Sequence, residues 1–366
     1  MKWNLFLFFI VIIFLASTCT TSQKAITLWQ LSGDITKNNY YGYDLNNIPL
    51  DVGDMPLKDF AFLEYDNHTK WGKVINIPSG FTPEKWLEGT KNPGLNVKEL
   101  HIQGIKGKGV SLALIDKPIN PNHSELNGRI NYYQVITDSA KVYNYRLHCH
   151  GIACASILCG ENCGVAPESE LFYIAVPDDT RDLHNHCLAV EKLIEINSSL
   201  PEGKKIKAVS ISHYVASVKN EEQVKIWAKF VKKANEHGIA VIYSDLQTTH
   251  AFFTGGGCPP YKDNNNPDNY DFSPWAKEYT DRIIVPADFR TTGNNKDTTH
   301  YTYWGDGGFS WAIPYLTGLA GLAWGIDESL TIEQIFGFLV ETKTETASGK
   351  LVINPNGFID AVRLGI

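Results

Sequence analysis

Short, largely apolar runs of residues recur along the chain from about residue 108 onward. They lie at residues 110–115, 171–176, 206–212, 239–243 and 283–287. Continuous apolar runs of this length are typical of strands that are buried on both faces of a parallel sheet. We therefore predict a buried strand at each of these places.

The segments between these runs have a helical pattern of apolar positions, which is clearest at residues 221–237. Val224, Trp227 and Val231 recur there at three- and four-residue steps, and Gly238 follows where a helix commonly ends. Strands that alternate with helices indicate βαβ units. The predicted fold class is α/β, with three layers: a mostly parallel twisted sheet and helices on both of its faces.

Residues 1–22 differ from the rest of the chain. Lys2 precedes an apolar run at residues 5–16, and small polar residues follow at 17–22. This order is typical of a secretory signal peptide, and the run is shorter than the ~20 residues that a transmembrane helix needs. We therefore predict a secreted, extracellular protein. Cys19 leaves a membrane-anchored lipoprotein as the alternative.

Residues 23–95 form a second distinct region. They are rich in Asn, Asp, Tyr and Trp and have weak periodicity. We interpret them as an N-terminal extension, which is either a propeptide or a strap over the domain. Residues 96–366 contain all the predicted strands and form the main domain.

The charged residues exclude one class of partner. The chain has 33 basic and 40 acidic residues and a formal net charge of -7. It has no cluster of Lys and Arg with interleaved aromatic residues, so we predict no nucleic-acid partner. A mild acidic excess suits an exported soluble protein.

The cysteines and one oxygen-rich loop bear on cofactors. After the predicted signal peptide the cysteines are Cys149, Cys154, Cys159, Cys163, Cys187 and Cys258. An even number in an exported chain permits disulfide bonds, whereas the alternative is that they are small buried residues. There is no C-x-x-C pair, so we expect no zinc site and predict no metal ligands. Residues 261–271 are either a calcium site or a solvated loop, and we expect no other cofactor.

Three segments contain residue types that nucleophilic catalysis requires. GKGVSLALID ends on Asp116, at the C-terminal end of a predicted strand, where α/β sheets place their sites. HGIACASIL begins with His150, and GVAP follows it. GFSWAIP places Ser310 at the start of an apolar helix. Each residue alone has a structural explanation, such as a helix cap for Ser310.

Taken together and in this order, the three segments resemble the subtilisin-like serine peptidase family, the subtilases. The resemblance covers about residues 100–366 and implies a subtilisin-like fold. It also implies a serine endopeptidase that forms an acyl-enzyme, with Ser310 as nucleophile, His150 as base and Asp116 as the residue that orients it. An α/β-hydrolase is excluded because it needs a His after the Ser, and the last His of this chain is His300. The expected partner is a peptide or protein substrate, and we expect a monomer.

The chain departs from the family at the second oxyanion donor, which is usually an Asn in a turn after a strand. Here residues 244–248 read Ser-Asp-Leu-Gln-Thr. The resemblance implies Gln247 or Asp245 in its place, and we favour Gln247 because an amide donates at any pH. Lys117-Pro118 and Ala153 also replace residues that are usual in the family.

The family's substrate-binding edge, where a peptide adds as an extra strand, corresponds to Ser210, Ser212 and His213. His213 replaces a small residue, which would narrow the adjoining pocket. Because of these departures, the alternative function is a catalytically weak or inactive pseudo-peptidase that binds peptides.

Overall fold

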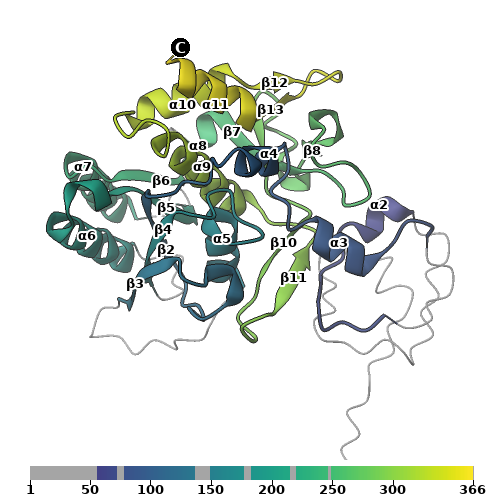
Figure 1. Cartoon of the computed structure of the whole chain (residues 1–366), viewed down its shortest axis with the longest axis horizontal. Helices are drawn as coiled ribbons and strands as arrows, with labels where there is room; N and C mark the ends of the chain where they lie inside the picture. Colours follow the sequence, from purple (N-terminus) through teal and green to yellow (C-terminus); the bar gives the residue numbers. More distant parts are fainter. Residues whose placement is uncertain are drawn as a thin grey trace, which may run out of the picture.

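The computed structural model describes residues 56–71, 78–136, 149–176, 183–214, 220–245 and 249–365. The predicted signal peptide, Cys19 and Gln247 lie outside the described residues, as does the side chain of His213. The following paragraphs concern the described parts of the chain, which Figure 1 shows in colour.

The centre of the molecule is a parallel sheet with the strand order β3-β4-β2-β5-β6. Its strands are β2 (Ser111–Asp116), β3 (Ile130–Val135), β4 (Glu170–Ala175), β5 (Ile206–Tyr214) and β6 (Ala240–Ser244). Four of the predicted strands are therefore confirmed as members of one sheet. β3 was not predicted, because its side chains are mostly half-buried and its sequence has no continuous apolar run.

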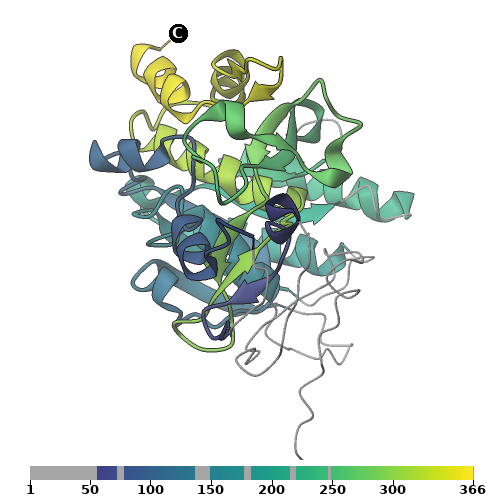
Figure 2. The ribbon, with the colours of Figure 1, turned by 90° about the vertical axis from the view of Figure 1, so that its right-hand side faces the viewer.

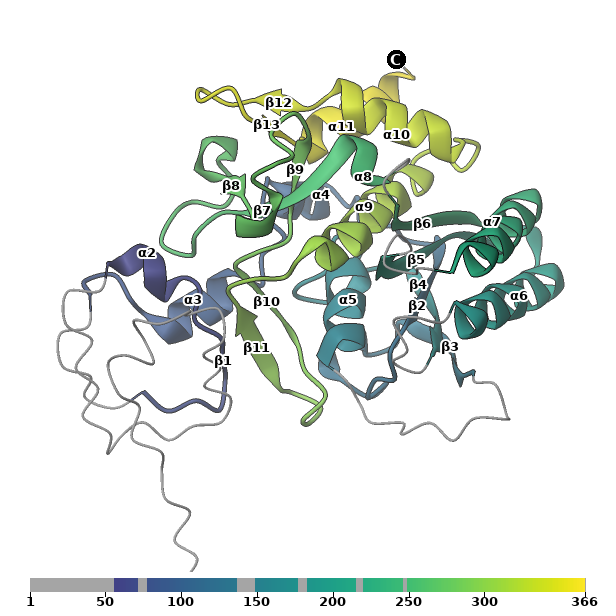
Figure 3. The ribbon, with the colours of Figure 1, turned by 180° about the vertical axis from the view of Figure 1, so that it is seen from behind.

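Helices cover both faces of this sheet, as Figures 1 and 3 show. The helices are α5 (Cys149–Cys159) and α9 (Phe309–Trp324) on one face and α6 (His184–Ser199) and α7 (Glu221–Glu236) on the other. Side chains of β2 alternate between the two cores: Leu112 and Leu114 pack toward α5 and α9, and Ala113 and Ile115 toward α6 and α7. The predicted three-layer α/β fold is confirmed.

The predicted helix at residues 221–237 is confirmed as α7. The side chain of Asn220 caps its N-terminus by accepting from the backbone N–H groups of Glu222 and Gln223. Trp227 and Ala234 are buried. Gly238 follows the helix with a φ of 76°, a conformation that favours glycine.

The fifth predicted strand belongs to a different sheet. β9 (Ile283–Pro286) pairs in parallel with β7 (Phe253–Gly257), and this second sheet has the order β12-β13-β9-β7-β8. The other strands are β8 (Asp271–Phe272), β12 (Thr344–Glu345) and β13 (Leu351–Val352). The expectation that this run joins the main sheet is therefore wrong. An apolar run indicates a buried strand but does not identify the strand's neighbours.

A third, three-stranded sheet joins the N-terminal region to the main domain. It has the order β1-β11-β10, with β1 (Tyr65–Asp66), β10 (Arg290–Gly293) and β11 (Tyr301–Trp304). The helices α2 (Leu57–Phe60) and α3 (Pro83–Gly89) lie beside it (Figures 1 and 2). A separate hydrophobic cluster fills this region: Phe60, Leu63, Tyr65, Phe81, Trp86, Leu87, Cys163, Tyr301 and Tyr303.

The remaining helices pack around the second sheet and beside α9. They are α4 (Val97–Ile102), α8 (Thr249–Phe252), α10 (Ile332–Glu341) and α11 (Pro355–Leu364). Short 3₁₀ turns lie at Ser124–Leu126, Glu202–Lys204, Pro267–Asn269 and Pro274–Ala276. Among the described segments, none of the helices has the length and apolar character that crossing a membrane requires.

The six cysteines of the described residues form no disulfide bond with one another, and all but Cys149 are buried. Of the two alternatives from the sequence, the structure supports small buried residues over disulfide bonds in this part of the chain. In the oxygen-rich loop, carboxylates accept hydrogen bonds from the protein: Asp263 from the Asn265 N–H and Asp268 from the Ala347 N–H.

Candidate active site

Asp116 and His150 meet at the carboxyl edge of the main sheet. Asp116 is the last residue of β2, and His150 lies in the first turn of α5. The His150 Nδ1 atom is 2.8 Å from Asp116 Oδ1 and 3.0 Å from Oδ2. The Asp116 side chain is 5% exposed and also accepts the Lys117 N–H at 2.7 Å.

Gly151 explains how α5 comes so close to the end of β2. A Cβ atom at this position would lie 2.4 Å from both the Lys117 carbonyl oxygen and the Tyr173 hydroxyl. Only glycine fits such an approach without a shift of the backbone. The His-Gly dipeptide therefore places the imidazole directly against the strand end.

The surroundings of the pair favour its charged forms. Burial alone raises the pKa of Asp116, but the His150 imidazolium and the Lys117 N–H outweigh burial, so the pKa of this carboxyl is lowered. Burial alone lowers the pKa of His150, but the Asp116 carboxylate outweighs it and raises the pKa well above 6.5. The pair is therefore an ion pair at neutral pH.

Ser310 lies in the first turn of α9, after the N-cap residue Gly308. The cap explanation for Ser310 is therefore wrong, because a glycine with a φ of 63° occupies the cap position and no side chain caps the helix. The Ser310 hydroxyl is half-buried and donates to the Ser212 carbonyl oxygen over 3.5 Å. This position leaves the hydroxyl at the helix N-terminus, where the dipole favours a developing negative charge.

Cys154 connects the two halves of the site. Its Sγ atom is 3.7 Å from His150 Nδ1 and 3.7 Å from the Ser310 carbonyl oxygen, and Ser212 Oγ donates to that same carbonyl at 2.6 Å. Asp116 of β2 and His150 of α5 are thus in direct contact, and Cys154 of α5 links His150 to the main chain of Ser310 in α9. Within the described residues, no hydrogen bond joins the Ser310 hydroxyl to the His150 ring. Such links are often long in the absence of substrate.

A cavity of about 340 Å³ lies beside Ser310. It is lined by Ser212, Ser244, His250, Trp275, Tyr279, Gly308, Phe309 and Ser310. The ring centroids of His250 and Phe309 are 4.5 Å apart, so one wall is aromatic. Burial and the Arg282 guanidinium lower the pKa of His250 to about 4, which makes this wall uncharged at neutral pH.

Sequence reasoning missed the aromatic wall of this cavity. His250 lies in α8, and Trp275 lies in a 3₁₀ turn far from any of the three motifs. No spacing or periodicity links these residues to Ser310 in the sequence. They reach the site because α8 and the 3₁₀ turn Pro274–Ala276 both pack against Phe309 at the start of α9.

The turn predicted to supply the second oxyanion donor borders the same cavity through Ser244. Asp245 follows β6 directly, and its main-chain carbonyl oxygen accepts the His250 N–H at 2.8 Å. Gln247 lies outside the described residues. Of the segment 244–248, the structure thus places Ser244 at the cavity wall.

The predicted substrate-binding residues occupy different positions on β5. Ser210 is buried and pairs with Leu114 of β2 and Ile242 of β6, so it is an interior position of the sheet. The Ser212 hydroxyl is bound to the Ser310 carbonyl. In the described residues, the pairing of β5 with β2 ends at Ser210. Ser212 therefore lies beyond the part of β5 that pairs with β2.

Comparison with protein-family models supports the resemblance that the motifs indicate. The model of the subtilase family of peptidases (Peptidase_S8) matches residues 107–245. This range includes Asp116, His150 and the turn after β6. Comparison with curated protein sequences gave no match.

Three solved structures illustrate the fold that this chain shares. The PatG macrocyclase domain has a TM-score of 0.52 and 12% identity and covers 74% of this chain and 95% of its own. The prenylagaramide maturation protease PagA has a TM-score of 0.51 and 16% identity, and the match covers 73% of this chain and 98% of PagA. The nisin leader peptidase NisP from Lactococcus lactis has a TM-score of 0.54 and 16% identity, and the match covers 75% of this chain and 93% of the NisP chain.

At these identities the likeness establishes the fold, which is that of the subtilisin-like peptidases. The resemblance to the subtilase family is therefore confirmed, and the chain has the architecture of a serine peptidase hydrolase. A peptidase of this family acts on a peptide or protein.

Proposed function

We propose that the protein is an exported serine endopeptidase that uses Asp116, His150 and Ser310 as its catalytic triad. The observation that carries this proposal is the buried Asp116 carboxylate, which holds the His150 ring at 2.8 Å, with Cys154 in contact with both that ring and the Ser310 carbonyl. A subtilase fold supports the same assignment. Export rests on the signal-peptide pattern of residues 1–22.

In the proposed reaction, His150 takes the Ser310 proton as the hydroxyl attacks the substrate carbonyl. His150 then protonates the leaving amine, and the acyl-enzyme is hydrolysed by water. Asp116 fixes the imidazole tautomer and stabilises the imidazolium. The Ser310 N–H, at the start of α9, donates to the oxyanion, and a second donor comes from residues 244–248.

The cavity next to Ser310 supports a preference in the substrate. Its aromatic wall, made by Trp275, Tyr279 and Phe309, suits an apolar or aromatic side chain at the residue that is acylated onto Ser310. His250, which is uncharged at neutral pH, adds no charge to this wall.

Labelling with a fluorophosphonate probe tests this function. We expect the processed protein to be labelled, Ser310→Ala to abolish labelling, and Ser244→Ala, which alters a serine of the same cavity, to retain it. Labelling that persists in Ser310→Ala would contradict the triad.

Two observations favour the pseudo-peptidase as a second candidate. The Ser310 hydroxyl donates to the Ser212 carbonyl, and the Asn that usually donates to the oxyanion in the family is absent from the sequence of residues 244–248. Correctly folded, processed protein that resists the probe, cleaves no peptide of a library and still binds peptides would support this alternative.

A further inference from the structure

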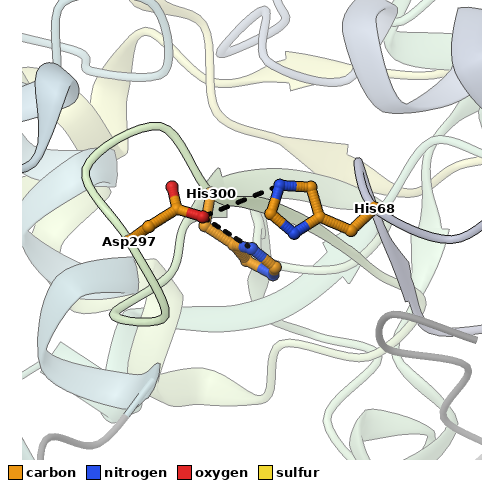
Figure 4. A group of neighbouring side chains, drawn as sticks. All are labelled: His68, Asp297 and His300. Carbon is orange, nitrogen blue, oxygen red and sulfur yellow. Dashed lines mark ion pairs between the residues drawn. The ribbon is translucent and has the colours of Figure 1, made fainter.

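Two histidines and an aspartate converge about β1 and β11, on residues that the proposed active site does not use. His68 follows β1, and Asp297 and His300 lie in the loop between β10 and β11. Asp297 Oδ2 is 3.6 Å from His68 Nε2 and 3.8 Å from His300 Nδ1. Figure 4 shows both imidazoles directed at this one carboxylate oxygen. One ligand atom from each residue lies within 4.8 Å of the others.

His300 is the residue that distinguishes this group from a chance surface cluster. Its side chain is 1% exposed, and its Nε2 atom lies 2.9 Å from Oδ2 of the buried Asp66. A ring proton on Nε2 would face this carboxylate and would leave Nδ1 with a lone pair for a metal. Among the described residues, the buried Nδ1 atom has no hydrogen-bond partner. A carboxylate behind a histidine is the arrangement that commonly orients metal-binding imidazoles.

The other two ligands are held by contacts of their own. Asp297 Oδ1 accepts the Thr299 N–H at 2.8 Å and the Thr299 hydroxyl at 3.1 Å, which leaves Oδ2 to face the histidines. The rings of His68 and His300 are perpendicular, with centroids 4.5 Å apart. The three side chains are therefore positioned before any ligand binds.

Backbone contacts fix the two segments against each other. The Asn67 N–H donates to the Tyr301 carbonyl at 3.0 Å, and the Asn67 side chain donates to the Thr299 carbonyl at 3.0 Å. Asp66 pairs with Thr302 across β1 and β11. The group thus spans a junction between residues more than two hundred positions apart in the sequence.

We propose that His68, Asp297 and His300 form a binding site for Zn²⁺ or a similar divalent first-row metal. Two imidazoles and one carboxylate are a ligand set that zinc accepts, with a fourth tetrahedral position open to water. Tetrahedral bonds of about 2.0–2.1 Å separate ligand atoms by ~3.3 Å, and small side-chain movements would bring the measured separations to this value. Calcium instead prefers a shell of six or more oxygens.

The metal would link β1 of the N-terminal region to the β10–β11 loop of the main domain. Because it binds the folded arrangement, it would stabilise that junction. The proposal does not depend on peptidase activity. Only Asp297 and His300 are close together in the sequence, and His68 is distant from both, so the ligands do not form a spacing pattern that identifies a zinc site.

The site is tested by measuring the binding of Zn²⁺ and Co²⁺ to the full processed protein. Its intact mass should first confirm that residue 68 is retained. We expect one equivalent of Zn²⁺ to bind and to raise the thermal midpoint. His68→Ala and Asp297→Ala remove half-exposed side chains, so they should fold, and each should weaken zinc binding by at least about tenfold. His237→Gln, which alters an exposed histidine at the end of α7, should bind zinc normally.

Asp116, His150 and Cys154 form a second cluster whose ligand atoms lie within 4.8 Å of one another. The absorption spectrum of bound Co²⁺ distinguishes the two clusters, because only the second contains a thiol. Co²⁺ bound by His68, Asp297 and His300 should give no thiolate charge-transfer band. Three results would overturn the proposal: no zinc binding by the wild type, binding unchanged in both variants, or a thiolate band from the bound cobalt.

Discussion

The proposed reaction requires an uncharged His150, because only the neutral imidazole can accept the Ser310 proton. His150 faces a carboxylate that is 5% exposed, and little solvent separates the two charges. The attraction is therefore stronger than between exposed groups, and it stabilises the imidazolium that forms during the reaction.

This electrostatic coupling predicts an alkaline pH profile. Since the pKa of His150 is raised well above 6.5, kcat/KM should rise with pH to a plateau that begins well above 6.5. Asp116→Asn removes the carboxylate, so the rising limb should move to lower pH and the plateau should fall by about 10⁴-fold. Rates on a peptide substrate between about pH 5 and 11 measure both effects. A limb that stays in place in Asp116→Asn would be inconsistent with the pairing.

The second oxyanion donor gives a prediction about two neighbouring residues. If the Gln247 amide donates, Gln247→Ala should lower kcat by about 10²-fold with little change in KM, because the interaction forms mainly in the transition state. If the Asp245 side chain donates instead, Asp245→Asn should keep or raise activity, because the amide would donate in its place. Steady-state kinetics of the two variants separates the cases, and unchanged kcat in Gln247→Ala would exclude Gln247.

At this scale the sequence predicted residues that belong to motifs and missed residues that meet only through packing. Asp116 and His150 sit at a strand end and a helix start, which local patterns reveal. His250, His68 and His300 lie in segments without such patterns, and their neighbours come from distant parts of the chain. The β-strand register that joins residues 66 and 302 is a tertiary property that no local pattern encodes.

At the scale of elements, the start of α5 is fitted closely to the end of β2. Gly151→Ala would place a Cβ atom 2.4 Å from the Lys117 carbonyl and the Tyr173 hydroxyl. We expect a loss of about 1–3 kcal/mol in the free energy of unfolding, because the helix must shift. The shift would also move His150 and lower kcat/KM. Urea denaturation and kinetics measure the two effects.

Gly337 in α10 is the matched control, since a Cβ atom there would meet nothing within 4 Å. Gly337→Ala should raise the free energy of unfolding by about 0.5–1 kcal/mol, as expected for a helix interior. Equal stability of the two variants would show that the approach of α5 to β2 is not tight.

The sequence predicted the positions of strands and helices better than it predicted which strands pair with one another. The apolar runs located β2, β4, β5, β6 and β9, and the apolar stripe located α7. The sheet to which β9 belongs was predicted wrongly, because period and hydrophobicity are the same for a buried strand in either sheet. The half-buried β3 lacked the pattern altogether.

For the whole molecule, one buried carboxyl makes stability depend on pH. Burial and the neighbouring Asp306 raise the pKa of Asp288 to about 7, although the Ser273 hydroxyl and the Gly307 N–H donate to it. When the pKa of a carboxyl is higher in the folded state than in the unfolded state, folding is favoured while the group is protonated. The free energy of unfolding of the protein therefore falls as pH rises from 3.8, the ordinary pKa of the carboxyl, to about 7.

Asp288→Asn should therefore remove a fall in stability over this pH range. The free energy of unfolding in urea, measured at about pH 4.5 and pH 8, should decrease less in the variant than in the wild type. Asp360→Asn, on the exposed side of α11, is a control that should keep the wild-type dependence. The same slope in Asp288→Asn and wild type would refute this role.

The N-terminal region gives the last prediction, which decides between a strap and a propeptide. Residues 56–95 make contacts typical of a permanent part of the fold. The Tyr303 hydroxyl donates to the Ala61 carbonyl at 2.6 Å, and the Thr291 N–H donates to the Thr90 carbonyl at 3.1 Å. Trp86 is 3% exposed within the aromatic cluster on β11. Removal of this region would expose that cluster, so we expect the processed protein to retain it as a strap.

Two measurements test the strap. The N-terminus of the secreted protein, determined by sequencing and intact mass, should lie before residue 57. Trp86→Ala should lower the free energy of unfolding of that protein by about 3–5 kcal/mol, because it empties a buried aromatic site. Ile102→Ala, which alters a side chain that is 77% exposed, should change it by less than about 0.5 kcal/mol. An N-terminus beyond residue 95 in active protein would establish a propeptide instead, and the junction that includes His68 would then exist only before processing.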